Sequence, residues 1–457
     1  MSDAIQQRDE LRGLSRELLA ELQLAKLKRL LSHAQQHNTF YQAKWQGLQG
    51  ESNWEFFKSL PFISKEDLVV GLDASHSNHN PSMSVLENRN GDKKSNSMEG
   101  WLLAANHTWR TEFYSRVHRT SGTRGKPLVV LDTQEDWHWW MEVWQYVLDT
   151  LDIVPGDRVF LAFSFGPFVG FWSAFEACQK RGALVIPGGG MSSLARLEWI
   201  RDSGATVVGC TPSYALHLAE IAEQNGLDLA DWNVRRMLVA GEPGGSIAAT
   251  KSRIESAWGV TVVDHAGATE IGPWGFATAD GTGLHVTETE FIAEFLPRPD
   301  FGEDVSELVL TNLGRFGCPV IRYRTGDLVR PRWSVQGEQA GTCSGGEACQ
   351  FVRLEGGILG RADDMLIVRG VNIFPGSIEA VLHSFPEIDE YRVTLFQQGN
   401  LDQIKVEVEG ESIDSYRITN ALQAGIGLRM DVVVVGRGEL PRFEGKGRRF
   451  CDQRQQS

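Results

Sequence analysis

Arg119-Thr-Ser-Gly-Thr-Arg-Gly-Lys-Pro127 joins residues 113–118 to an extended apolar run at residues 128–131. The stretch holds two glycines, three hydroxyl side chains, two arginines and one lysine. Such a loop can close its backbone N–H groups around phosphate oxygens, because glycine tolerates the backbone conformations that this requires. A P-loop would need four residues between its glycines, whereas only two separate Gly122 from Gly125, and Pro127 stands where Ser or Thr is needed. The stretch therefore predicts a phosphate site of another kind, with an ordinary hairpin turn as the alternative.

Four further motifs follow this loop along the chain. They are Gly267-Ala-Thr-Glu270, Arg322-Tyr-Arg-Thr-Gly-Asp-Leu328, Leu359-Gly-Arg-Ala-Asp-Asp-Met365 and Pro441-Arg-Phe-Glu-Gly-Lys446. With the loop, they resemble in content and order the motifs of the acyl-adenylate-forming superfamily, which includes acyl-CoA synthetases and the adenylation domains of peptide synthetases. Residues 360–379 resemble specifically the phenylacetate-CoA ligase branch. The resemblance covers the chain from about Leu27 onward.

The bulk properties are those of an ordinary globular protein with several domains. The chain has 457 residues, 42% hydrophobic and 23% charged, which is too long for one core. A net charge of −14 argues against nucleic-acid binding. No apolar run is long enough to span a bilayer and no signal segment is evident, so we expect a cytoplasmic protein without a membrane partner. The six cysteines lack a scaffold spacing, which predicts reduced thiols.

The pattern of elements predicts an α/β fold. Strands expected at residues 158–163, 183–187, 206–209, 236–239 and 261–263 alternate with helices, which is typical of doubly wound parallel sheets whose ligands gather at the carboxyl ends of the strands. Short antiparallel strands over 291–332 predict a small β-subdomain. We expect a large domain at residues 1–361 and a small, mobile α+β domain at 362–457.

Helix signals are clear in three places. Apolar residues at helical spacing predict one long amphipathic helix over residues 14–45. Ser64 with Asp67 predicts the start of a short helix, and Thr133 with Asp136 predicts a capping box that opens a longer one. Residues 73–99 are rich in Ser, Asn, His and Lys, which predicts a long exposed loop.

The resemblance implies a site for ATP and Mg²⁺. The loop would hold the β- and γ-phosphates through Thr120, Ser121, Gly122, Thr123, Arg124, Gly125 and Lys126. Other residues at the nucleotide would be Gly241, Glu242, Pro243, His265, Ala266, Gly267, Asp327 and Arg361. Two residues depart from the family pattern in the loop: Arg124 stands where Thr is usual, and Leu128 where many relatives have Lys.

Individual roles follow from the same resemblance, each with an ordinary alternative. Glu270 would bind Mg²⁺ and Thr269 would contact the α-phosphate, although such a pair is also typical of a helix start. Ala266 replaces an aromatic residue that often stacks on adenine, which leaves the purine to neighbours such as His265. Asp327 would accept both ribose hydroxyls, although Asp after Thr-Gly is also common in turns.

The resemblance also implies roles for residues of the C-terminal region, which would rotate between the two half-reactions. Lys446 would stabilise the charge that develops during adenylation, whereas composition alone indicates a solvated basic tail. Asp363 would be the hinge about which the small domain rotates, and Arg369 and Gly370 would then face coenzyme A.

The acid is expected to be aromatic. The pocket would be lined by Trp137, Trp140, Phe163, Phe165, Phe168, Gly188, Gly189, Gly190 and Trp274, with core packing as the alternative for Trp137 and Trp140. Cys343, Cys349 and His285 hint at a zinc site that some relatives carry. Their spacing is wrong for a Cys-rich zinc motif, and Thr278 lies near an expected ligand position, so we expect no intact zinc site.

Together these features predict an aryl- or arylacetyl-CoA ligase that forms acyl-AMP and then a CoA thioester. Two alternatives remain open at this point. An adenylating enzyme of secondary metabolism would pass the acyl group to a carrier protein or an amine. A non-catalytic acyl- or nucleotide-binding protein would keep only the fold. The sequence also leaves a homodimer open.

Overall fold

The structure is a computed structural model that describes residues 2–69, 103–120, 127–163, 165–333, 349–362, 366–368, 371–373, 375–398, 401–442 and 449–454. The expected loop at 73–99 lies outside these residues. So do Ser121 to Lys126 of the phosphate loop, Cys343, Asp363, Arg369, Gly370 and Lys446.

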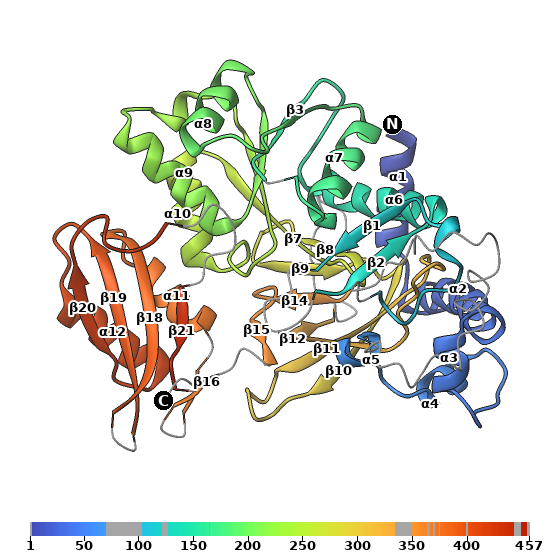
Figure 1. Cartoon of the computed structure of the whole chain (residues 1–457). Coiled ribbons are helices and arrows are strands. Elements are labelled where there is room, and N and C mark those ends of the chain that lie inside the picture. Colours follow the sequence, from blue (N-terminus) through green and yellow to red (C-terminus); the bar gives the residue numbers. More distant parts are fainter. Residues whose placement is uncertain are drawn as a thin grey trace, which may run out of the picture.

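A mixed sheet of nine strands runs through the large part of the described chain, in the order β13-β14-β9-β8-β7-β6-β5-β3-β4 (Figure 1). Its parallel half contains β3 (Arg158–Leu161), β4 (Leu184–Pro187), β5 (Val207–Cys210), β6 (Arg236–Ala240) and β7 (Thr261–Ala268). The antiparallel half adds β8 (Gly272–Ala277), β9 (Gly283–Val286), β13 (Pro331–Arg332) and β14 (Arg353–Glu355). Every residue of β5 is buried, as expected for a strand that is covered on both faces.

Helices separate the parallel strands. They are α7 (Val169–Arg181), α8 (Ser193–Asp202), α9 (Pro212–Gln224) and α10 (Ala248–Trp258), with a short 3₁₀ helix η4 (Leu229–Asp231). The helix α6 (Gln134–Thr150) precedes the sheet and packs on it, because the Trp144 ring lies 4.3 Å from the ring of His265. The predicted capping box is confirmed, since Asp136 N–H donates to the Thr133 hydroxyl and Thr133 N–H to the Asp136 carboxylate.

The N-terminal helices differ from the sequence prediction. In place of one helix over 14–45, the chain forms α1 (Ser2–Arg12), α2 (Arg16–His37) and α3 (Thr39–Lys44). The single long helix is therefore wrong: Asn38 leaves helical geometry, and its side-chain oxygen accepts from Tyr41 N–H at 3.2 Å to start α3. Two short helices follow, α4 (Trp54–Ser59) and α5 (Lys65–Leu68), and the start of α5 after Ser64 is as predicted.

Two small sheets flank the large one. The antiparallel sheet predicted over 291–332 contains β10 (Phe291–Pro297), β11 (Ser306–Asn312), β12 (Tyr323–Val329) and β15 (Gly360–Arg361). A hairpin of β1 (Arg116–Arg119) and β2 (Val129–Asp132) follows the 3₁₀ helix η3 (Thr111–Phe113). Arg322, just before β12, has a φ of 54° and ties this sheet to α4, because its guanidinium binds Glu294 and the carbonyl oxygen of Lys58.

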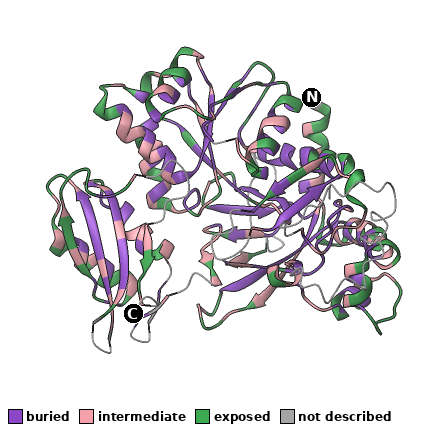
Figure 2. Cartoon of the chain, viewed as in Figure 1, coloured by how far each residue is buried: buried purple, intermediate pink, exposed green. Residues whose placement is uncertain are grey.

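Residues 366–454 have a hydrophobic core of their own, centred on Val393, Val406 and Ile418. They form β16 (Leu366–Val368), β17 (Val371–Ile373), α11 (Pro375–His383), β18 (Ile388–Gln398), β19 (Leu401–Gly410), α12 (Ser415–Ile426), β20 (Asp431–Val435) and β21 (Phe450–Asp452). We call them the C-terminal part, and residues 2–362 the large part. Figure 2 shows the buried strands at the centre of each. The predicted α/β fold, with an antiparallel β-subdomain and a C-terminal α+β region, is confirmed. None of the described helices has the length and apolarity to cross a membrane.

Candidate active site

The predicted phosphate loop connects the two strands of the β1–β2 hairpin. Arg119 pairs with Val129, and Thr120 N–H donates to the carbonyl oxygen of Leu128 at 2.9 Å. The buried hydroxyl of Thr120 accepts from Leu128 N–H at 3.0 Å. The strands on either side of the loop are therefore paired as a hairpin, while residues 121–126 lie outside the described residues. Their phosphate contacts stay a prediction.

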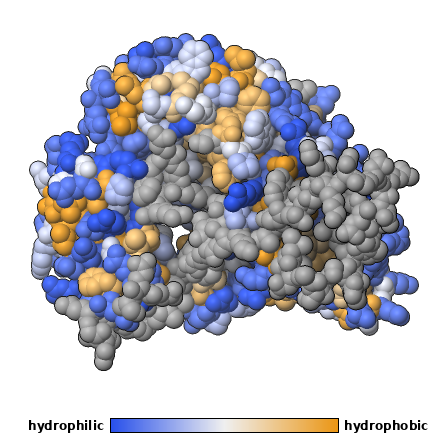
Figure 3. Space-filling model, in the orientation of Figure 1, coloured by the Kyte–Doolittle hydropathy of each residue, from blue (hydrophilic) through white to orange (hydrophobic). Residues whose placement is uncertain are grey.

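An aromatic cluster adjoins the loop end of this hairpin. Arg119 N–H donates to the carbonyl oxygen of Pro167 at 2.7 Å, which joins β1 to the segment between β3 and α7. The ring of Phe163 lies 4.2 Å from that of Phe171, and the ring of Phe165 lies 5.2 Å from that of Trp172. Phe168 and Trp172 are more than a third exposed, and Figure 3 shows a hydrophobic area over α7 and the segment before it. The cluster thus combines buried rings with rings that face solvent.

The three predicted floor glycines follow β4, and Gly189 lies against this cluster. Gly188 N–H donates to the carbonyl oxygen of Leu161 at 2.9 Å, and Arg196 Nε donates to the Gly188 oxygen at 2.8 Å. A Cβ added to Gly189 would come within 2.7 Å of Phe165 Cδ2, so only glycine allows this approach. The structure therefore brings Phe163, Phe165, Phe168 and Gly188 to Gly190 together at the carboxyl ends of β3 and β4, as predicted from the strand order.

The three predicted pocket tryptophans are buried in the interior. Trp137 Nε1 donates to Glu176 at 2.7 Å, and Trp140 Nε1 donates to Asp132 at 3.2 Å. Trp274 is 1% exposed in β8. Core packing, the alternative that the sequence left open, accounts for these contacts, and a role in substrate binding stays a prediction.

A buried ion pair joins the hairpin to the turn between β7 and β8. Arg315 and Asp132 are both fully buried, and their nearest charged atoms are 2.7 Å apart. Arg315 Nη1 also donates to the carbonyl oxygen of Thr269 at 3.0 Å. Although burial opposes ionisation, the Arg315 guanidinium holds the pKa of Asp132 below its usual value. One guanidinium therefore fixes the distance between the phosphate-loop hairpin and the Thr269–Glu270 turn.

Glu270 and Asp327 meet around Tyr323. Tyr323 donates its hydroxyl to Glu270 Oε1 at 3.0 Å. Asp327 and Arg361 are cross-strand partners on β12 and β15, and Asp327 Oδ1 lies 3.6 Å from Arg361 Nη1. Burial, together with the charge of Glu270, raises the pKa of Tyr323 well above its usual value, so its hydroxyl remains a donor. Tyr323 thus binds the predicted metal ligand, Glu270, and lies on the same strand as the predicted ribose ligand, Asp327.

The remaining predicted nucleotide residues lie at the ends of β6 and β7. Gly241 has a φ of 94°, Pro243 is exposed, and Glu242 accepts from Ser213 N–H at 2.7 Å in the first turn of α9. His265 is buried against Trp144, and its Nδ1 is 2.7 Å from the carbonyl oxygen of Gly275. Burial lowers the pKa of His265 to about 4, so its ring is neutral at pH 7. Ala266 is buried and Gly267 is exposed.

A half-buried carboxylate, Asp264, lies on β7 directly before His265. Asp264 accepts from the Ser246 hydroxyl at 2.6 Å and from His265 N–H at 3.0 Å. A Cβ on Gly245 would come within 2.5 Å of Asp264 Cγ, and a Cβ on Gly357 within 3.5 Å of its Oδ2. Burial raises the pKa of Asp264 to about 6. Asp264 therefore anchors the loop that leads into α10 and lies close to the loop that leads toward β15.

Sequence reasoning missed Tyr323, Arg315 and Asp264 as site residues. Tyr323 lies inside the Arg322 to Leu328 motif and Asp264 stands three residues before Gly267, so a signal was available for both. Arg315 lies outside every motif, and its role depends on tertiary contacts alone.

The hinted zinc site gains no support from the described residues. Within them, no group of three or more His, Cys, Asp or Glu side chains is placed to hold a metal ion, and Cys343 lies outside them. His285 is buried with Nδ1 3.2 Å from the carbonyl oxygen of Phe351, and burial lowers its pKa to about 4.

The chain is similar to known proteins over nearly its whole length. A family model, the AMP-binding enzyme C-terminal domain, matches residues 370–454. The phenylacetate-coenzyme A ligase of Thermus thermophilus is 30% identical over 482 residues, covering 97% of this chain and 99% of that protein. Two crystal structures of 2-hydroxyisobutyryl-CoA ligase, 24% identical, superpose over 97% of this chain and 91% of theirs. The TM-score is 0.82 for the postadenylation state with 2-HIB-AMP and 0.65 for the thioesterification state with 2-HIB-AMP and CoA.

Proposed function

The chain belongs to the phenylacetate-CoA ligase family of acyl-adenylate-forming enzymes, and we propose that the acid it activates is aromatic, of the aryl or arylacetic type. As an AMP-forming acid–CoA ligase it uses ATP and Mg²⁺ to convert the acid to acyl-AMP and pyrophosphate. It then transfers the acyl group to CoA, which releases AMP.

The aromatic substrate class is supported by one observation above all. The hydrogen bond from Arg119 to Pro167 joins the phosphate-loop hairpin to the cluster of Phe163, Phe165 and Phe168. An aromatic ring held among these side chains would leave its carboxylate on the side of the hairpin. Flat rings also suit a slot whose floor, Gly188 to Gly190, has no side chains.

The residues around Tyr323 have the chemistry that the nucleotide requires. A half-buried carboxylate is a ligand that Mg²⁺ prefers, and Tyr323 orients the one on Glu270 by donating to Oε1. Glu270 would thus hold the ion, whose charge neutralises the phosphates. Asp327 would accept the ribose hydroxyls while Arg361 balances its charge, and Thr269 would contact the α-phosphate from a turn that Arg315 holds in place.

We further propose that the structure represents the arrangement used for adenylation. The higher TM-score against the postadenylation structure, at the same coverage of both chains, supports this proposal. In this proposal Asp363 is the hinge between a large domain at 1–361 and a small one at 362–457. Lys446 acts during adenylation, and rotation then brings Arg369 and Gly370 to CoA.

Pyrophosphate release across a panel of acids tests the proposed function. The panel contains phenylacetate, benzoate, 2-hydroxyisobutyrate and acetate, each with and without CoA. We expect the two aromatic acids to be the better substrates, with continuous AMP formation only when CoA is present. Release that stalls after one turnover with or without CoA would indicate a carrier protein or an amine as acceptor. Turnover with the aliphatic acids alone would contradict the proposed substrate class.

A further inference from the structure

Arg442 bridges the C-terminal part and the large part. Its Nη2 donates to Glu220 of α9 at 2.8 Å and its Nε donates to the other oxygen of Glu220 at 3.2 Å. The same guanidinium donates to both oxygens of Glu409 on β19, at 2.6 Å and 3.1 Å. One arginine is therefore held by two carboxylates, each in the two-point geometry that gives strong and directional pairing.

The two halves of this bridge differ in what they connect. Glu409 is fully buried and also accepts from the backbone N–H groups of Gly438 and Leu440, so it belongs to the same rigid unit as Arg442. Glu220 is attached to the large part. Any rotation of the C-terminal part would carry Glu409 along with Arg442 but would separate Arg442 from Glu220.

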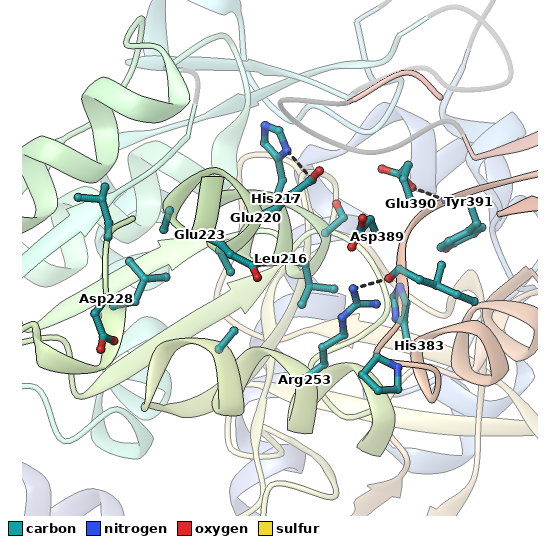
Figure 4. Close-up of a pocket in the computed structure, with 18 of the residues that line it drawn as sticks. Leu216, His217, Glu220, Glu223, Asp228, Arg253, His383, Asp389, Glu390 and Tyr391 are labelled. Carbon is teal, nitrogen blue, oxygen red and sulfur yellow. Dashed lines mark hydrogen bonds and ion pairs between the residues drawn. The ribbon is translucent and has the colours of Figure 1, made fainter. Parts of the chain in front are cut away.

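The bridge lies beside an open space between the two parts. A cavity of about 540 Å³ is bounded by α9 and α10 on one side and by the end of α11 and the start of β18 on the other. Figure 4 shows Glu220 and His217 on one wall, with Asp389 and Glu390 opposite. Two polar contacts made by α10 also cross here: Thr250 Oγ1 to His383 Nδ1 at 2.7 Å, and Arg253 to the carbonyl oxygen of Ile388 at 2.5 Å. Specific polar contacts therefore contribute to joining the parts at this point.

Glu220 is ionised in this setting. Burial opposes its ionisation, but His217 and Arg442 together lower its pKa to about 2. Because the pKa is lowered, the attraction between Glu220 and Arg442 is fully present at pH values above about 4.5 and is lost only as the pH falls toward 2. The bridge is thus intact under any condition in which the enzyme would be assayed.

We infer that Glu220 is a positioning residue for the adenylation half-reaction, acting through Arg442. Arg442 stands in the same Pro441-to-Lys446 motif as Lys446, so its attachment to α9 fixes where this segment begins relative to the nucleotide site. The inference rests on the proposed role of Lys446 and adds a residue of the large part that no motif marks. The contact must form for adenylation and break before thioester formation.

The test compares the two half-reactions in full-length Glu220→Gln. This substitution keeps the shape of the side chain and removes its charge. We expect the rate of acyl-AMP formation to fall about 10-fold or more, since loss of a bidentate charged pair weakens positioning by this order. The rate of thioester formation from supplied acyl-AMP and CoA should stay within about 2-fold of the parent enzyme, a change of ~0.4 kcal/mol in the barrier.

Matched variants separate positioning from stability. Glu223→Gln changes an exposed carboxylate on the same helix and the same cavity wall, and it should leave both half-reactions unchanged. Arg442→Lys keeps the positive charge but loses the two-point geometry, and it should show the same selective loss as Glu220→Gln. Equal losses in both half-reactions, or a fall in Tm that accounts for the lost activity, would indicate a merely structural contact and overturn the inference.

Lys446→Ala, assayed beside these variants, shows which idea has failed. If the parent enzyme forms acyl-AMP and Lys446→Ala does not, but Glu220→Gln matches the parent, then only the positioning role is wrong. If the parent enzyme forms no acyl-AMP from any acid in the panel, the proposed function itself fails.

Discussion

The cluster around Tyr323 and the bridge at Arg442, to which we assign roles in the same adenylation step, are built differently. Around Tyr323 the contacts among the described residues lie within the large part: Asp327 and Arg361 pair on neighbouring strands, and buried Arg315 fixes the turn that holds Glu270. The Arg442 bridge crosses between two separately packed cores beside a cavity. The difference between them is one of connection: the contacts around Tyr323 join residues of one part, whereas the Arg442 bridge joins two parts and, in our proposal, is the one that a rotation would break.

The largest effect should come from Lys446→Ala. We expect it to lower the rate of acyl-AMP formation by at least about 100-fold, the loss typical when one group that stabilises a transition state is removed. Thioester formation from supplied acyl-AMP should remain largely intact, because in the proposed mechanism rotation of the C-terminal part withdraws this lysine before that step. Single-turnover assays of each half-reaction measure both values. Equal losses in the two steps would contradict the proposal that the contacts of the C-terminal part change between the two half-reactions.

Arg315→Met tests the contacts that lie within the large part. The substitution leaves Asp132 buried without its cation, which should lower the free energy of unfolding by about 3–5 kcal/mol. Both half-reactions should suffer together, because the hairpin and the Thr269–Glu270 turn lose their common anchor. Circular dichroism during thermal unfolding measures the loss. Arg201→Met, which removes an exposed ion pair to Asp202, serves as a control and should change stability by less than about 1 kcal/mol.

Asp327→Ala should act mainly on nucleotide binding. Loss of a charged acceptor for the ribose hydroxyls should raise the KM for ATP by at least about 10-fold, since even one such hydrogen bond contributes ~1.5–3 kcal/mol. Steady-state kinetics at varied ATP, with the acid saturating, gives this value. An unchanged KM for ATP would remove Asp327 from the nucleotide site and leave its pairing with Arg361 as a structural contact only.

The sequence predicted most of the architecture but not the contacts that organise the site. Alternating strands and helices predicted the shared edge where Phe163, Gly188 and Glu270 lie, because the carboxyl ends of parallel strands meet there. The break at Asn38 was missed because a cap interrupts a continuous pattern of leucines. Arg315 and Glu220 were missed for another reason: each acts on a residue far away in the chain, and local spacing carries no sign of that.

The smallest effect concerns Asp264, which lies in the large part and whose ionised form is disfavoured by burial. Its pKa is raised to about 6 from an ordinary value of 3.8, so the folded state holds more protons than the unfolded state between these values. Stability should therefore fall as the pH rises from about 4 to 6 and stay reduced above that, by at most ~3 kcal/mol. Asp264→Asn should raise Tm at pH 7.5 and leave it nearly unchanged at pH 4, which thermal unfolding at the two pH values measures. A lower Tm at pH 7.5 would show that the charge itself stabilises the loops around Ser246.

The most direct test of the central claim is the ratio of kcat/KM for phenylacetate to that for 2-hydroxyisobutyrate, measured as AMP formation with saturating ATP and CoA. The account predicts a ratio of about 100 or more, because a ring packed among Phe163, Phe165 and Phe168 gains apolar contacts that a small aliphatic acid cannot make. A ratio below one, with AMP still formed only in the presence of CoA, would leave the ligase in place and contradict the aromatic site.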